Sequence, residues 1–227
     1  MWKTFKNLIW PKKCINCGQE GSYLCPDCFA LIDISRQPPS RDFKYLDALY
    51  FPTTYDEKIV QSAIHLCKYS YIRELSETLA DLIIAHFQLL DKPLPATLPA
   101  RGGLRANPPA DLLCAVPLHK TKLKQRGFNQ AEEIAQHLSK FLKVPFLPDV
   151  LVKIKKTPSQ TALSKEERKK NVSGVFKANP QKQKMIEGKN IFLVDDILTT
   201  GATMEECAKI LKQNLASSVW GVVVARD

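Results

Sequence analysis

Residues 191–203 read IFLVDDILTTGAT, and this stretch decides the expected fold. Its four apolar residues, 191–194, predict a strand that is buried on both faces. A turn containing Gly201 follows, and residues 202–211 carry the apolar spacing of a helix. The same alternation of strand and helix recurs through the second half of the chain. We therefore expect an α/β fold with a mainly parallel sheet and flanking helices.

The other expected elements are short strands and amphipathic helices. The strands are expected at 45–55, 112–116, 150–154, 174–177 and 219–225, and the helices at 59–67, 72–90 and 130–142. The proline-rich stretch 91–110 is expected to be a loop. With 227 residues, the chain is long enough for one main domain and a small satellite.

The chain is basic, with a formal charge of +10 from 33 basic and 23 acidic residues. This excess favours phosphates, nucleic acid or an acidic membrane face as partners, although a solvated basic surface explains it equally well. No run approaches the roughly 20 apolar residues of a membrane span. The first residues lack the apolar core and cleavage site of a signal peptide. We expect a cytoplasmic protein whose residues 1–13 pack on its own body or lie peripherally at the inner face of the membrane.

The turn after the predicted strand suits a phosphorylated sugar. A helix N-terminus offers unpaired N–H groups to an anion, and Thr199, Thr200 and Thr203 add hydroxyl donors. Asp195 and Asp196 would repel a phosphate, so we expect them to face a ribose 2′,3′-diol or a Mg²⁺ ion. The alternative is that the aspartates only cap the helix and the threonines only form the turn.

Basic residues gather before Gly127, and we interpret them as a second anion site. The group comprises Lys120, Lys122, Lys124 and Arg126, and it would suit a pyrophosphate. Arg126 could instead form a structural salt bridge, and the nearby His119 could be only a satisfied polar residue. Asn129 or Asn171 could cap a helix.

Four of the seven cysteines, Cys14, Cys17, Cys25 and Cys28, lie within fifteen residues. Two Cys-x₂-Cys pairs supply four thiolates, which suits a tetrahedral structural Zn²⁺ with no open coordination position. An iron–sulfur cluster or a redox dithiol are the alternatives. Cys67, Cys114 and Cys207 lie in apolar patterns and are expected to be buried free thiols.

Taken together, these motifs resemble a known family. Residues 191–203 resemble the phosphoribosyl pyrophosphate signature of type I phosphoribosyltransferases. Residues 116–135 (VPLHKTKLKQRGFNQAEEIA), residues 156–176 (KTPSQTALSKEERKKNVSGVF) and the terminal VVVAR resemble the ComF family, which is associated with natural competence. The four-cysteine module is also typical of that family. The resemblance implies a zinc-binding module at 1–40 and a phosphoribosyltransferase-like domain at 41–227.

The resemblance also implies a ligand and the residues that bind it. The ligand would be phosphoribosyl pyrophosphate with Mg²⁺, and Asp195 and Asp196 match the catalytic acids that hold the ribose. Residues 157–168 resemble a mobile loop that closes over the substrate, and Lys156 stands where an arginine is common. Substrate contacts are implied for Lys68, for the pyrophosphate loop Pro117, Leu118 and His119, and for the 5′-phosphate loop Thr199, Thr200, Gly201, Ala202 and Thr203.

Two classes of function remain open on the sequence. The first is a phosphoribosyltransferase with an acceptor that the sequence does not name. The second is a non-catalytic protein of DNA uptake that binds single-stranded DNA or acts as an adaptor for a competence helicase or translocase. The basic charge and the ComF resemblance motivate the second class.

Overall fold

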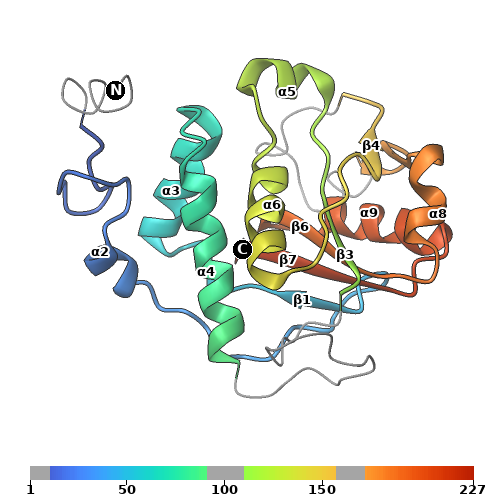
Figure 1. The fold of residues 1–227 in the computed structure, drawn as a ribbon, viewed down its shortest axis with the longest axis horizontal. Coiled ribbons are helices and arrows are strands. Elements are labelled where there is room, and N and C mark those ends of the chain that lie inside the picture. The colour runs from blue at the N-terminus through green and yellow to red at the C-terminus, as the bar shows by residue number, and fades with distance from the viewer. Residues whose placement is uncertain (1–10, 91–109, 157–171) are drawn as a thin grey trace.

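The computed structural model describes residues 11–90, 110–156 and 172–227. Its central sheet has the strand order β1-β7-β6-β3, and all these pairings are parallel (Figure 1). The strands are β1 (Ala48–Tyr50), β3 (Leu112–Ala115), β6 (Asn190–Leu198) and β7 (Ser218–Arg226). The short strand β2 (Thr53–Thr54) continues alongside the end of β7. The expected mainly parallel α/β fold is confirmed.

Helices cover both faces of this sheet. Neighbouring residues of β6 point to opposite faces, so they pack against different helices. Phe192 and Val194 belong to the core formed with the first group of helices, whereas Ile191 and Leu193 belong to the core formed with the last long helix. The first group contains α3 (Lys58–Tyr69), α4 (Leu75–Leu89) and α6 (Gln130–Leu142), and the last long helix is α9 (Ala202–Gln213). Figure 1 shows α4 and α6 side by side, with α9 on the other side of β6.

Several boundaries differ from the sequence prediction. The strand predicted at 191–194 continues to Leu198, so Asp195 and Asp196 lie within it and not after it. The strand predicted at 45–55 is interrupted between β1 and β2, at a segment that contains Pro52. Proline lacks the N–H that a strand needs for its ladder, which explains the interruption. Helix α6 has the predicted bounds.

Other short elements were not predicted or pair differently. β4 (Leu151–Lys153) and β5 (Phe176–Ala178) form a separate antiparallel pair outside the parallel sheet. The basic stretch before Gly127 forms a short helix, α5 (Lys120–Arg126), which lies at the top of Figure 1. It buries no residue, so it has no apolar periodicity from which it could be predicted. A 3-10 turn, η2 (Pro180–Lys182), leads into the one-turn helix α8 (Gln183–Ile186).

The cysteine module packs directly on the main body. Cys25, Cys28 and Ile32 share one hydrophobic core with residues of α3 and α4, and Lys12 forms an ion pair with Glu74. The module contains one short helix, α2 (Pro26–Ala30). The prediction for residues 1–13 lies largely outside the described residues, as do those for 91–109 and for the loop 157–168. Within the described ranges, no helix is long and apolar enough to cross a membrane.

Candidate functional site

The candidate site lies where the parallel strands end. Ligands of open α/β sheets bind beyond the carboxyl ends of the strands. β6 and β3 are neighbours there, since Val116 N donates to Val194 O over 2.9 Å. The loop after β3 therefore starts beside Asp195 and Asp196, and the loop after β6 leads into α9.

The turn into α9 has the backbone that the phosphate-loop prediction requires. Gly201 is the N-cap residue of α9 and has φ +75°, a left-handed conformation that glycine adopts without strain. Glycine has no side chain that could cap the helix, and Ala202 N donates a long bond of 3.5 Å to Thr200 Oγ1. α9 therefore presents its N-terminus at the carboxyl end of β6, which is the arrangement that binds anions.

The start of α9 is also held in place from outside. The Glu205 carboxylate accepts the backbone N–H groups of Lys44 and Tyr45 over 2.7 and 2.8 Å. Phe43 lies beside the loop, because a Cβ built on Gly201 would be 3.8 Å from its ring. The segment 43–45 thus fixes the start of α9 and the loop before it, and nothing in the sequence pattern indicated this contact.

The two aspartates project toward different surroundings. Asp196 is 3% exposed and accepts hydrogen bonds from Lys68 Nζ and Gln130 Nε2, each 2.9 Å from Oδ2. Asp195 acts electrostatically on Cys207 of α9 and Lys153 of β4, which lie on the other side of the sheet. This follows from the extended strand, in which consecutive side chains alternate. A ligand that contacts both carboxylates must therefore lie across the end of β6.

Burial and neighbouring charges shift the pKa values of Asp195 and Lys68. Desolvation, and then the neighbouring Asp196 carboxylate, raise the pKa of Asp195 to about 8. Burial alone would lower the pKa of Lys68, but the paired Asp196 carboxylate outweighs it, so the pKa of Lys68 is raised. Lys68 therefore stays charged at neutral pH and neutralises Asp196. A positive partner, such as a metal ion, would favour ionised Asp195.

Further cations surround the aspartates. Desolvation, followed by repulsion from Arg126 and Lys68, lowers the pKa of Lys122. Desolvation and then repulsion from Lys122 lower the pKa of Lys153, while Asp195 acts in the opposite direction. These mutual effects place Lys68, Lys122, Arg126 and Lys153 around one site. Such a group suits a polyanion such as pyrophosphate.

The predicted pyrophosphate loop lies between β3 and α5. Pro117, Leu118 and His119 are half-buried at the carboxyl end of β3, and His119 Nδ1 accepts the Thr121 backbone N–H over 3.3 Å. His119 therefore has the structural role of capping α5. No carboxylate pairs with Arg126 in the described part of the chain, so its structural salt bridge is not found there. Asn129 caps α6 by accepting from Ala131 N, as one alternative predicted.

Sequence reasoning missed two residues of this site. Gln130 lies at the start of α6 and fixes Asp196, and the only signal was its place beside the capping Asn129. Lys153 is a single lysine in the apolar strand LVKI, which does not distinguish it from a surface lysine. Both are brought to Asp195 and Asp196 by contacts between elements far apart in the sequence.

The oxygen atoms at the end of β6 fit a hard divalent cation. The Asp195 and Asp196 carboxylates are the ligand type that Mg²⁺ prefers. Gln130 Oε1 adds a buried carbonyl oxygen that has no hydrogen-bond partner within the described residues. A bound Mg²⁺ would supply positive charge to the phosphate groups of a ligand. The donor set therefore agrees with the predicted magnesium-bound sugar phosphate.

The four module cysteines form a compact cluster. The Sγ atoms of Cys14, Cys17, Cys25 and Cys28 all lie within 4.8 Å of one another. Burial raises the pKa of Cys14, but hydrogen bonds from backbone N–H groups outweigh it and bring the pKa to about 6. The thiolate is the form that binds metal. The cluster fits a tetrahedral zinc module with Zn–S distances of about 2.3 Å.

Comparisons with known proteins identify a domain and two groups of relatives. The family model described as the phosphoribosyl transferase domain matches residues 123–227, which include β6, the loop and α9. Competence protein F of Haemophilus influenzae is 32% identical over 117 residues, 51% of this chain and 51% of that protein. Competence protein ComFC of Bacillus subtilis is 32% identical over 51% of this chain and 45% of that protein.

A second group of relatives carries a different name. The DNA utilization protein YhgH of Escherichia coli K12 is 28% identical over 156 residues, 69% of this chain and 62% of that protein. The match thus spans 51% of the length of competence protein F and 62% of the length of YhgH from Escherichia coli K12. A solved glutamine phosphoribosylpyrophosphate amidotransferase from Bacillus subtilis is 17% identical, covers 68% of this chain and 26% of that chain, and has a TM-score of 0.36, a likeness too weak to inform on ligands.

The competence and DNA utilization proteins, the phosphoribosyl transferase domain and the four-cysteine cluster agree with the sequence motifs. This combined evidence supports the ComF family, which the motifs predicted, and residues 123–227 match a phosphoribosyl transferase domain.

Proposed function

We propose that the chain binds phosphoribosyl pyrophosphate with Mg²⁺ at the end of β6, and that it serves DNA uptake in natural competence. The observation that carries the proposal is the joint placement of Asp195, Asp196 and the glycine turn at Gly201 among four cations. The carboxylates would hold the ribose diol and the metal. Thr199, Thr200, Gly201, Ala202 and Thr203 would hold the 5′-phosphate.

The pyrophosphate would lie on the side of the aspartates that faces away from the 5′-phosphate loop. Lys68, Lys122, Arg126 and Lys153 supply positive charge there, and residues 117–119 supply backbone groups next to β3. In a transfer reaction, the bond between sugar C1 and a pyrophosphate oxygen breaks while a bond from C1 to the acceptor forms. The cations stabilise the charge that develops on the departing pyrophosphate, and the fixed loop keeps C1 in place.

Calorimetric titration with phosphoribosyl pyrophosphate and Mg²⁺ tests the binding. The double change Asp195→Asn and Asp196→Asn should weaken it by about 10- to 150-fold, because charge-assisted bonds of about 1.5–3 kcal/mol are lost. Asp111→Asn is the matched control, since Asp111 Oδ2 accepts Asn190 N at the opposite end of β6. Absence of binding to the unaltered protein would refute the proposal.

A second candidate function is a non-catalytic adaptor that binds single-stranded DNA for a competence helicase or translocase on the cytoplasmic side of the membrane. The exposed, basic α5 and the +10 charge favour it, together with the names of the relatives. Fluorescence anisotropy with a labelled oligonucleotide tests it at low and high salt. Binding that falls with salt, and that weakens in a Lys120→Gln and Lys124→Gln variant, is expected. No binding at low salt would exclude the DNA-binding version.

A further inference from the structure

The terminal motif VVVAR ends at Arg226, and no role has so far been assigned to this arginine. Arg226 is the last residue of β7, at the carboxyl edge of the sheet where Asp195 and Asp196 lie. It pairs with Leu198 of β6, and Asp227 N extends this contact by donating to Leu198 O over 2.9 Å. Neighbouring strands are about 4.8 Å apart, so the backbone of Arg226 lies beside the start of the 5′-phosphate loop.

The Arg226 guanidinium lies over two aromatic rings. Its central carbon is 5.9 Å from the ring centroid of Phe43 and 5.6 Å from that of Phe51. Phe43 in turn borders the 5′-phosphate loop, because a Cβ built on Gly201 would be 3.8 Å from its ring. Aromatic faces attract a cation and restrain it without accepting its N–H groups in ordinary hydrogen bonds. The two rings therefore position the guanidinium beside the loop.

In the part of the chain that the structure describes, this guanidinium has no ionic partner. Arg226 is half-buried, and its N–H groups form neither an ion pair nor a hydrogen bond with residues 11–90, 110–156 or 172–227. A charge that is partly removed from water is costly without a partner. The planar fork of guanidinium donors matches the paired oxygens of a carboxylate or a phosphate. The side chain therefore suits an oxyanion that a ligand supplies.

The strand order places Arg226 opposite the proposed pyrophosphate site. β6 lies between β3 and β7, and the pyrophosphate is proposed to lie on the β3 side, near Lys68 and Arg126. An acceptor that displaces pyrophosphate approaches sugar C1 from the face opposite the leaving group, as water does in inverting glycoside hydrolysis. We therefore expect the acceptor above the end of β7, where Arg226 supplies the positive charge.

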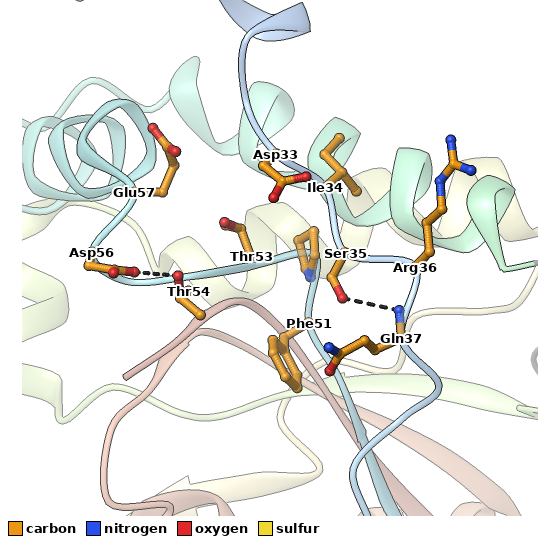
Figure 2. A pocket seen from close by; sticks show the side chains of 11 residues that line it. Asp33, Ile34, Ser35, Arg36, Gln37, Phe51, Thr53, Thr54, Asp56 and Glu57 are labelled. Atoms are coloured by element: carbon orange, nitrogen blue, oxygen red, sulfur yellow. Dashed lines mark hydrogen bonds between the residues drawn. The ribbon is translucent and has the colours of Figure 1, made fainter.

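A cavity beyond Phe51 limits where an anion can bind (Figure 2). It has a volume of about 530 Å³ and lies between the segments 33–37 and 51–57. Three carboxylates and one arginine are among its lining residues: Asp33, Asp56, Glu57 and Arg36. Figure 2 shows the Phe51 ring pointing away from Asp33 and Glu57. Because these carboxylates repel an anion, an oxyanion on the guanidinium would lie away from the cavity, toward the 5′-phosphate loop.

We infer that Arg226 binds an oxyanion, either a carboxylate or a phosphate group, on the acceptor that reacts with the sugar. The inference rests on the proposed binding of phosphoribosyl pyrophosphate, which determines where the acceptor lies. The oxyanion lies in the plane of the guanidinium fork, and the reacting atom of the acceptor faces sugar C1. Arg226 thus selects the acceptor and does not hold the donor.

Binding of small oxyanions to the full-length, zinc-loaded protein tests the inference. Ribose 5-phosphate, pyrophosphate and Mg²⁺ are added at saturation, because together they fill the donor subsites and cannot react. Benzoate and phenyl phosphate are then titrated calorimetrically, with benzamide as the neutral probe. At least one oxyanion should bind, and benzamide should bind at least about tenfold more weakly, because it lacks the charge-assisted bond. The oxyanion that binds shows whether the acceptor carries a carboxylate or a phosphate.

Variants of Arg226 separate recognition of the oxyanion from support of the fold. Arg226→Gln should weaken binding of the oxyanion at least about tenfold and leave the affinity for ribose 5-phosphate unchanged. Arg226→Lys should restore part of the binding, because lysine restores the charge without the fork. Lys184→Gln is the matched control, since it removes one exposed positive charge from α8, which precedes β6 at the opposite edge of the sheet.

The inference is overturned if neither oxyanion binds to the unaltered protein with its donor subsites filled, or if both Arg226 variants bind the oxyanion as the unaltered protein does. Equal loss of oxyanion and ribose 5-phosphate binding in both variants would also overturn it, because that result indicates a purely structural arginine. If the unaltered protein binds neither ribose 5-phosphate nor phosphoribosyl pyrophosphate, the proposed function itself is refuted.

Discussion

Replacing Lys68 by methionine would remove the cation of the buried pair with Asp196 and keep most of its apolar stem. The two side chains are 20% and 5% exposed, and Lys68 Nζ is 2.9 Å from Asp196 Oδ2. At an effective dielectric constant of about 20, unit charges about 4 Å apart attract by roughly 4 kcal/mol. Truncating one partner of a buried pair costs about 3–5 kcal/mol. The partial exposure of Lys68 and the remaining bond from Gln130 reduce this cost, so we expect the free energy of unfolding to fall by about 2–3 kcal/mol.

Urea unfolding at pH 7 without ligand measures the loss, and a double-mutant cycle isolates the pair. The cycle compares Lys68→Met, Asp196→Asn and the double variant, and we expect a coupling energy above about 1.5 kcal/mol. Lys212→Met is the control, because the more exposed pair Lys212–Asp47 should contribute less than about 1 kcal/mol. A Lys68–Asp196 coupling energy below about 0.5 kcal/mol would refute the reasoning.

The pH dependence of the same pair has a defined sign. The pKa of Lys68 is raised above its ordinary value of 10.5 by Asp196, against the opposing effect of burial. A raised lysine pKa stabilises the folded protein below the unfolded value, and this stabilisation is lost as the pH rises through the folded value. Below the Asp195 pKa of about 8, the difference between the unaltered protein and Lys68→Met should therefore be nearly constant, and the part due to the Lys68 charge should be lost above pH 10.5.

Asp195 should follow the same rule in a lower pH range, because its folded pKa of about 8 exceeds the ordinary 3.8. The folded protein therefore loses stability as the pH rises between these values, and Asp195→Asn should stabilise the ligand-free protein more at pH 9 than at pH 5 in thermal unfolding. Gly201→Ala should cost about 1–2 kcal/mol because φ is +75°, and Gly188→Ala, at φ +68°, should cost a similar amount in urea unfolding. Only Gly201→Ala should weaken donor binding in titration, and equal weakening by both would contradict the role of the loop. Metal analysis should find one zinc per chain, Cys25→Ser should lose it and unfold at a lower temperature, and Cys114→Ser should retain it. Full zinc retention by Cys25→Ser would contradict the four-thiolate site.

The strand and loop at 191–203 could be predicted because they carry strong local signals. An apolar run reports a buried strand, and a glycine before a helical pattern reports a turn, whatever surrounds them. The predicted end of the strand was wrong, because the polar residues Asp195 and Asp196 do not continue an apolar run. Their pairing with β7 holds them in the ladder, and such pairing is a tertiary contact.

The partners of the aspartates could be predicted only in part. Lys68 was assigned through the resemblance, but no local pattern indicates that it pairs with Asp196 or that Gln130 completes the group. Each contact joins residues more than sixty positions apart. The cavity walls at 33–37 and 51–57 were likewise invisible, because one is an irregular segment and the other a two-residue strand with its flanks.

The placement of Asp195 and Asp196 on opposite sides of β6 has a consequence for tolerance to insertions and deletions. Removing one residue from 191–194 would shift the strand by one position and exchange the faces of every side chain after it. The carboxylate that meets Lys68 and Gln130 would then turn toward Cys207 and the apolar face of α9, and it would lose both of these partners. In a deletion scan, these four positions should therefore be among the least tolerant of the chain, although each of them accepts a change between similar apolar residues.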